Sequence, residues 1–319
     1  MSDDQQRTFR EVQAHFRLPS IALVEKDLFV VRAIATLASI DTTPFQLVFG
    51  GGTALARAHR IVQRMSEDVD FKVVPLPAAP VSRSGIRRHL GQLRARVTEN
   101  FQAAGFAFDP KDESVSYAMD SNRYMVWLLP YTSDNGAGEG LRATIKVELN
   151  HTVMRRPTIA LPVRSFVNEA TNDAPESATV PCVSITETAA EKLVSLTRRT
   201  AMELAGAGRE PDPTLVRHIY DLHMMRTLID PADVATLARG IAEADAQEFS
   251  NQHPAYAADI RGETHKAITA LQTDPTHLRR YDDFVSAMVY GEKIAFADAL
   301  ATVTELAETM MREQGNTTC

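Results

Sequence analysis

The sequence predicts an α+β domain over residues 1–175, followed by an α-helical domain over residues 176–319. Three observations lead to this prediction. Short segments that alternate apolar and polar residues gather in the first half, prolines gather in residues 157–183, and the rest has helical periodicity. A chain of 319 residues is also longer than one ordinary domain.

The composition is that of a soluble globular protein, with 44% apolar and 24% charged residues. Two cysteines, Cys182 and Cys319, are too few for a disulfide framework or a cysteine-rich metal site. The N-terminal residues are polar and acidic, and no apolar run approaches the roughly 18–20 residues of a membrane span. We therefore expect a cytoplasmic protein with no membrane partner. The net charge of −7 argues against a general nucleic-acid coat.

One helix and two strands are expected at the start of the chain. Residues 9–38 carry apolar residues at spacings of three and four, which predicts a helix packed on the sheet. Residues 45–49 have the pattern of a buried strand, with residues 69–74 as its partner. The proline-rich residues 75–80 cannot continue that ladder and form a linker.

Asp68 and Asp70 stand two positions apart in a segment where Val69, Phe71 and Val73 alternate with polar residues. The period of a strand places both carboxylates on one face. Two like charges held this close need a cation between them or a raised pKa. Mg²⁺ is the natural candidate, because it accepts a few carboxylates and completes its coordination with waters and phosphate oxygens. The segment therefore predicts a magnesium site.

Three glycines, Gly50, Gly51 and Gly52, separate the first strand from a short helix that begins near Thr53. Consecutive glycines let the backbone approach a ligand, and a helix start offers free N–H groups to an anion. A P-loop would need a Gly-Lys-Ser/Thr ending, and a dinucleotide fingerprint would need a glycine where Leu55 stands. The turn therefore predicts a phosphate-binding site of another kind, in which Gly51, Gly52 and Thr53 contact the phosphates.

A second helix is expected over residues 83–104, and it is rich in basic residues. A solvated helix face is the favoured interpretation. The alternative is a track for an RNA backbone or a triphosphate, whose binding would weaken steeply with salt. The basic residues are Arg83, Arg87, Arg88, His89, Arg94 and Arg96.

A meander of strands is expected next, with Asp134-Asn135-Gly136 and two further glycines as a hairpin signal. In the last strand Thr144, Lys146 and Glu148 alternate with apolar residues, so Glu148 is a candidate third carboxylate beside the two aspartates. The alternative is an ordinary exposed strand residue. The expected strands are residues 106–108, 115–119, 124–129 and 142–150.

Residues 157–183 predict a boundary between domains. After it, residues 184–187 (Ser-Ile-Thr-Glu) form a capping box that opens a helix. His218 and His223 lack the spacing of a zinc motif, so we expect no zinc site.

These motifs resemble the nucleotidyltransferase-like family of AbiEii/AbiGii-type toxins, which includes the mycobacterial MenT toxins. The resemblance rests on residues 51–55 (Gly-Gly-Thr-Ala-Leu), on residues 64–71 (Arg-Met-Ser-Glu-Asp-Val-Asp-Phe), and on two later stretches. Residues 191–192 match a Glu-Lys pair, and residues 216–222 match an Arg-Asp-x-x-Asp-Leu segment except at His218, where the family often has Asp. The role of position 218 is therefore in doubt.

The resemblance implies a nucleotidyltransferase-like mixed sheet with flanking helices, and a helical C-terminal domain that completes the active-site cleft. It also matches Lys146-Val147-Glu148 to a strand pattern that carries the third acid. The implied nucleotide-binding residues are Gly51, Gly52, Thr53, Arg64, Ser66 and Lys192. The implied catalytic residues are Asp68, Asp70, Glu148, Lys192 and Asp221, of which Asp68, Asp70 and Glu148 would bind the metal.

Lys192 would neutralise the triphosphate, and Asp221 would hold that lysine or position the nucleophile. The alternative is a salt bridge between helices, and both interpretations predict that the two residues pair.

The implied reaction transfers NMP from an NTP to an acceptor, with two Mg²⁺ ions and release of pyrophosphate. The implied acceptor is the 3′ end of tRNA, and the implied partner is a cognate antitoxin. Two alternatives stay open. In the first, the acceptor is a protein or a small molecule. In the second, the chain is a non-catalytic NTP-binding module.

Overall fold

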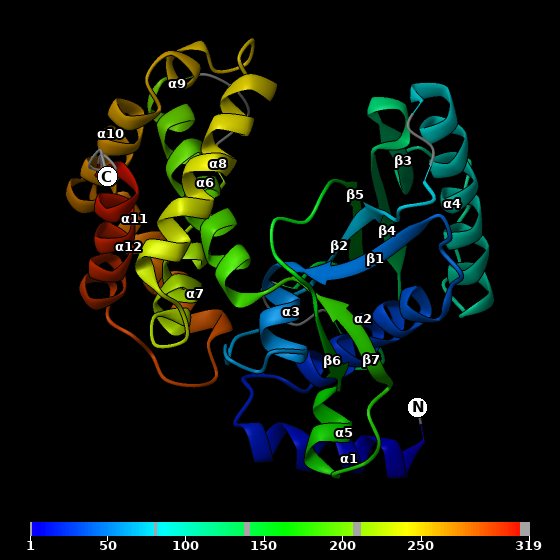
Figure 1. The fold of residues 1–319 in the computed structure, drawn as a ribbon. Helices are drawn as coiled ribbons and strands as arrows, with labels where there is room; N and C mark the ends of the chain where they lie inside the picture. Colours follow the sequence, from blue (N-terminus) through cyan, green and yellow to red (C-terminus); the bar gives the residue numbers. More distant parts are fainter. Residues whose placement is uncertain (1, 80–81, 137–140, 207–211, 313–319) are drawn as a thin grey trace. The chain divides into compact units, whose positions relative to one another are not determined.

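The computed structural model describes residues 2–79, 82–136, 141–206 and 212–312. The chain forms two compact units, Met1–Val183 and Ser184–Cys319 (Figure 1). The first unit combines a sheet with helices, and the second consists of helices in its described part. The first unit ends at Val183 and not at residue 175, because the strand Ser177–Cys182 belongs to its sheet.

Seven strands of the described chain form one mixed sheet in the order β3-β4-β5-β2-β1-β7-β6 (Figure 1). At its centre β2 pairs antiparallel with β1 and parallel with β5. The strands are β1 (Phe45–Gly50), β2 (Asp68–Pro75), β3 (Ser116–Met119), β4 (Tyr124–Pro130), β5 (Thr144–His151), β6 (Ile159–Val163) and β7 (Ser177–Cys182).

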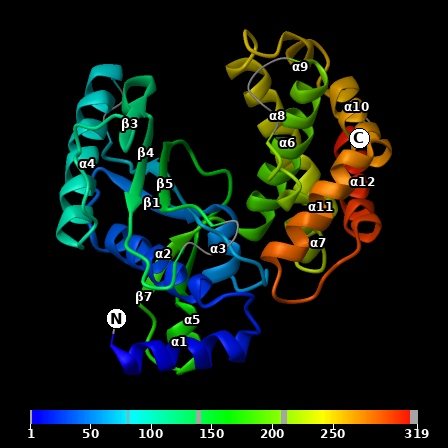
Figure 2. The same cartoon turned by 180° about the vertical axis from the view of Figure 1, so that it is seen from behind.

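One face of this sheet carries the hydrophobic core of the first unit. Val69, Phe71 and Val73 of β2 point into it, as the alternation in the sequence predicts. Helices α2 (Ile21–Ser39) and α4 (Arg83–Ala103) cover this face with their own apolar residues. Figures 1 and 2 show α4 running beside the β3–β4 end of the sheet, where Phe101 packs edge-on against Trp127.

The prediction of a single helix over residues 9–38 is wrong. The structure has two helices there, α1 (Asp3–Phe16) and α2. Arg17 adopts a left-handed conformation that ends α1, and Ser20 caps α2 by accepting a hydrogen bond from the backbone of Ala22. Pro19 between them has no N–H to donate, so a continuous helix could not pass through it.

Residues 106–108 are not a strand either. Gly105, with φ +91°, ends α4 in the left-handed region, and the backbone N–H of Phe106 returns to the carbonyl of Phe101. The later strands do form the predicted meander, because β3, β4 and β5 pair antiparallel in chain order, and β5 then pairs parallel with β2. The predicted hairpin joins β4 to β5, and its two further glycines, Gly138 and Gly140, lie outside the described residues.

Residues 157–183 were expected to form only a boundary, and they are part of the fold. They contain β6, the short helix α5 (Phe166–Ala170) and β7. Pro162 is compatible with its strand because β6 forms the edge of the sheet and its pairing is irregular between Leu161 and Val163.

The second unit is helical, as predicted. Ser184 caps its first helix by accepting a hydrogen bond from the backbone of Glu187, and Asp230 with Pro231 opens a later one. None of the helices in the described part of the chain has both the length and the apolar character needed to cross a membrane. The helices are α6 (Ile185–Leu204), α7 (Arg217–Met225), α8 (Pro231–Glu248), α9 (Pro254–Ala258), α10 (Ile260–Thr273), α11 (Pro275–Met288) and α12 (Phe296–Met311).

Candidate active site

The face of the sheet opposite the core carries the three predicted carboxylates. Asp68 and Asp70 lie on β2 two positions apart, on the side opposite the buried Val69 and Phe71. In the parallel register of β2 and β5, Glu148 stands directly beside Asp70. We call this surface of β2 and β5, defined by Asp68, Asp70 and Glu148, the acid face.

The glycine turn lies directly against the acid face. Gly50 pairs with Asp70 across β1 and β2, and α3 (Gly51–Arg57) begins at the next residue. Gly51 has φ +71°, and a Cβ atom there would collide with the carboxylate of Asp70. A Cβ atom on Gly52 would collide with the guanidinium of Arg64. Because neither position carries a side chain, the turn can approach both charged groups closely.

The side chains that follow the turn fasten α3 to the start of β2. The buried hydroxyl of Thr53 lies 2.8 Å from the hydroxyl of Ser66 and donates to the backbone carbonyl of Asp68. The buried guanidinium of Arg64 donates to the carbonyl of Met65 at 3.0 Å. The side chain of Thr53 therefore serves the local fold, and what this residue offers a ligand at the start of α3 is its backbone N–H.

Basic side chains contact two of the carboxylates. Nη2 of Arg142, just before β5, lies 2.5 Å from Oδ1 of Asp68. Nζ of Lys146 lies 2.9 Å from Oε1 of Glu148, and the hydroxyl of Tyr124 donates to the same oxygen. Burial by itself would lower the pKa of Arg142, but the surrounding carboxylates, Asp68 first, outweigh it and raise that pKa.

The acid face suits a divalent cation by the chemistry of its oxygens. Three carboxylates on neighbouring positions of two paired strands are the ligands that Mg²⁺ prefers in proteins. Across the described ranges, however, no three histidine, cysteine or acidic side chains converge as a metal would require. In this structure Arg142 contacts Asp68 and Lys146 contacts Glu148.

A second cluster of predicted residues lies in the second unit, where α6 meets α7. Nζ of Lys192 lies 2.8 Å from Oδ2 of Asp221, and both side chains are buried. Nδ1 of His218 lies 3.2 Å from the backbone carbonyl of Lys192. Burial, and then the ammonium of Lys192, lower the pKa of His218 well below its usual range, so its imidazole is neutral. The predicted pairing of Lys192 with Asp221 is confirmed.

Sequence reasoning assigned no role to the buried ion pair of Lys26 and Glu67. Nζ of Lys26 lies 2.5 Å from Oε2 of Glu67 and 2.5 Å from the carbonyl of Arg142. Lys26 is the middle one of three consecutive charged residues of α2 that are all buried. Glu25 accepts hydrogen bonds from the backbone of residues 134 and 135, and Asp27 pairs with Arg57 at 3.0 Å. A charged triplet inside an apolar helix was the signal that could have found this network.

The basic residues of α4 lie away from the acid face. Leu90, Leu93 and Val97 of this helix join the core on the opposite side of the sheet. Arg94 donates to the carbonyl of Ser116, and Arg96 donates to the carbonyl of Thr43. Arg83, Arg87 and Arg88 are exposed. This placement favours the interpretation of a solvated helix face.

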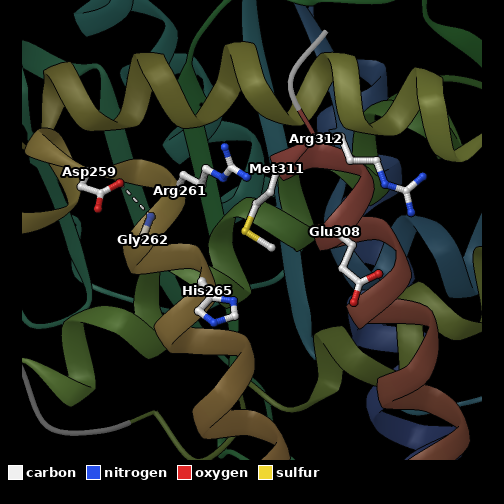
Figure 3. A pocket seen from close by; sticks show the side chains of 7 residues that line it. All are labelled: Asp259, Arg261, Gly262, His265, Glu308, Met311 and Arg312. Atoms are coloured by element: carbon white, nitrogen blue, oxygen red, sulfur yellow. Dashed lines mark hydrogen bonds between the residues drawn. The ribbon is translucent and has the colours of Figure 1, made fainter. Parts of the chain in front are cut away.

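A hollow of about 580 Å³ opens in the second unit between α10 and α12 (Figure 3). None of the predicted site residues lines it. Its charges are mixed, since Arg261, Arg312, Glu308 and Asp259 all line it, and Asp259 accepts a hydrogen bond from the backbone of Gly262 at 2.7 Å. We therefore place the candidate site on the acid face.

Comparison with known proteins identifies a family and a shared fold. The family model described as "Nucleotidyl transferase AbiEii toxin, Type IV TA system" matches residues 32–302. Among solved structures, the chain is similar to MenT4, a nucleotidyltransferase toxin from Mycobacterium tuberculosis H37Rv, with a TM-score of 0.55 and 15% identity over 96% of this chain and 90% of that chain. At this identity the likeness shows a shared fold, which confirms the predicted nucleotidyltransferase-like architecture. No curated protein matches the sequence.

Proposed function

Because this chain belongs to the AbiEii family of nucleotidyltransferase toxins of type IV toxin–antitoxin systems, we propose that it transfers NMP from an NTP to the 3′ end of tRNA. The hydroxyl oxygen of the tRNA end attacks the α-phosphorus, a new phosphodiester bond forms, and the bond to the β-phosphate oxygen breaks. Pyrophosphate leaves, and the hydroxyl proton passes to a carboxylate of the site. Growth would stop because a modified tRNA end cannot be charged.

The observation that carries this proposal is the contact between the glycine turn and the acid face. Gly51 lies against the carboxylate of Asp70, so the start of α3 and the carboxylates border one site. A triphosphate there would meet the backbone N–H groups of Gly51, Gly52 and Thr53 beside the carboxylates. The buried guanidinium of Arg64 lies close to Gly52, and the hydroxyl of Ser66 lies within hydrogen-bond distance of the hydroxyl of Thr53.

Nucleotidyltransferases generally use divalent metal ions, and we propose Mg²⁺ for this one. Asp68, Asp70 and Glu148 would hold two ions, which supply charge neutralisation at the phosphates and lower the pKa of the attacking hydroxyl. Glu148 would assist the attacking hydroxyl, because it stands beside Asp70 and already accepts a hydrogen bond from the hydroxyl of Tyr124.

We also propose roles for Lys192 and Asp221, which belong to the helical unit. The ammonium of Lys192 would neutralise the triphosphate as charge builds on the leaving pyrophosphate. Asp221, at 2.8 Å, would hold that ammonium in place. We further propose that the protein acts in the cytoplasm, where NTPs and tRNA occur, and that a cognate antitoxin restrains it.

The test is to incubate the protein with each α-labelled NTP and total tRNA, and then to sequence the 3′ ends. We expect added nucleotides on tRNA and their loss in the Asp68→Asn variant. Label on protein or on a small molecule alone would replace tRNA as the acceptor. NTP binding without pyrophosphate release would indicate a binding module, and equal labelling by the Asp68→Asn variant would refute the role of the acid face.

A further inference from the structure

Arg142 lies where the acid face would receive its cation. Its Nη2 atom is 2.5 Å from Oδ1 of Asp68, and its Nε atom is 3.8 Å from Oε1 of Glu67. The electrostatic influence of Asp70 reaches the same guanidinium. A guanidinium at this position neutralises the carboxylates that a divalent ion would otherwise bind.

The backbone of Arg142 is fixed, whereas its side chain is accessible. Its N–H donates to Oε2 of Glu67 at 2.9 Å, and its carbonyl accepts from Nζ of Lys26 at 2.5 Å. Lys26 and Glu67 are themselves buried and paired. The side chain of Arg142 is 43% exposed. The guanidinium can therefore change partner by rotating its own torsions, while the buried pair keeps its pivot in place.

We propose that Arg142 is a further phosphate-binding residue of this site, whose guanidinium occupies Asp68 until a divalent cation takes its place and then binds the triphosphate. This inference rests on the proposed function and assigns a residue that the motifs do not include. No covalent step involves Arg142, which only exchanges one anionic partner for another.

Two physical arguments support the exchange. An ion pair that water reaches contributes little to stability, so a divalent ion with a higher charge can displace the guanidinium from Asp68. The incoming nucleotide brings phosphate oxygens to the same face, and the planar fork of a guanidinium matches phosphate in a bidentate arrangement. The guanidinium that leaves Asp68 can therefore bind the phosphate oxygens nearby.

The first measurement is Mn²⁺ binding to the intact protein without nucleotide, followed by electron paramagnetic resonance. Removing the competitor in Arg142→Gln should tighten Mn²⁺ binding by about fivefold, because an exposed ion pair of this kind is weak. The matched control is Arg123→Gln, since Arg123 is 42% exposed and contacts Asp120, which is not a site residue. It should leave the affinity unchanged. If Arg142→Gln binds Mn²⁺ no tighter than the natural protein, the inference is refuted.

The second measurement is the affinity for the α,β-methylene analogues of the four NTPs in the presence of Mg²⁺. For the analogue that binds best, Arg142→Gln should weaken binding by about tenfold, because charge-assisted bidentate contacts to phosphate are strong. Arg142→Lys should bind with intermediate affinity, since it keeps the charge and loses the fork. Unchanged affinity in Arg142→Gln also refutes the inference.

A third variant separates this inference from the proposed function. Asp68→Asn should abolish the Mn²⁺ binding seen in the natural protein. If it does not, the metal site on the acid face fails, and the role of Arg142 fails with it. If Asp68→Asn abolishes binding and Arg142→Gln changes neither affinity, the proposed function stands and only the inference about Arg142 falls.

Discussion

The ammonium of Lys192 and the carboxylate of Asp221 lie 2.8 Å apart and are both buried, so an ion pair joins α6 to α7. The imidazole of His218 in α7 lies within hydrogen-bond distance of the backbone carbonyl of Lys192 in α6, and this contact links the same two helices. The pair therefore contributes to the fold of the second unit in addition to its proposed part in catalysis.

These two contributions can be separated by mutation. Asp221→Leu leaves a buried ammonium without this carboxylate, so we expect the free energy of unfolding to fall by about 3–5 kcal/mol in a urea titration. The double variant Lys192→Met/Asp221→Leu removes both charges and should recover most of that loss. It should nevertheless transfer no nucleotide. Full activity in the stable double variant would contradict the proposed role of Lys192.

Gly51→Ala should abolish nucleotide transfer, and its loss of stability alone should not explain the loss of activity. The added Cβ meets the carboxylate of Asp70 and also sits at a φ of +71°, which alone costs about 1–2 kcal/mol. Gly105→Ala is the matched control, because Gly105 also has a positive φ, and a Cβ there meets nothing within 4 Å. Both variants should lose the stability that the positive φ costs, Gly51→Ala should lose more because of the contact with Asp70, and only Gly51→Ala should lose activity. Equal activities would show that the approach of Gly51 to Asp70 is not needed.

Asp27 should make the stability of the first unit depend on pH. Burial raises its pKa to about 6 from 3.8, despite the opposing charge of Arg57. The folded state then binds the proton more tightly than the unfolded state. This contribution is complete below about pH 4 and is lost as the pH rises through about 6, with a size of about 3 kcal/mol.

The measurement compares urea unfolding of the natural protein and Asp27→Asn between pH 4 and 7. As the pH rises, the free energy of unfolding of the natural protein should fall relative to that of Asp27→Asn. A difference that stays constant over this range would show that the pKa of Asp27 is not raised.

Reversing the charge of α4 should leave tRNA binding unchanged. Arg87 and Arg88 are exposed on a helix that covers the core face, opposite the acid face. We expect Arg87→Glu/Arg88→Glu to keep the KM for tRNA of the natural protein at several salt concentrations. If the helix instead binds the RNA backbone, KM should rise in the double variant. The slope of log KM against log salt concentration should then fall by about 2, one for each lost phosphate contact.

The local parts of the fold could be predicted because their causes are local. The alternation around Asp68 and Asp70 identified β2 and its two faces, and Ser184 marked the start of α6. The break between α1 and α2 was missed although Pro19 and Ser20 carry its signal, because the apolar period continues across it. Residues 157–183 were misjudged because prolines mark edge strands as well as linkers.

The missed parts of the site depend on contacts between distant residues. Lys26 reaches the carbonyl of Arg142 from α2, and no spacing rule relates two positions so far apart in the chain. The order of the strands has the same character, since nothing local indicates that β5 lies between β4 and β2. Motifs therefore identified the carboxylates, whereas the basic groups that hold them emerged only from the folded structure.

The pairing of β5 with β2 has a consequence for synthesis. A chain still on the ribosome can contain β1, the glycine turn and β2 long before residues 144–151 exist. Until β5 is made and inserted, Glu148 cannot stand beside Asp70. Truncated or unfinished copies therefore lack the complete set of carboxylates, and the cell that makes this protein meets the assembled acid face only after translation has passed β5.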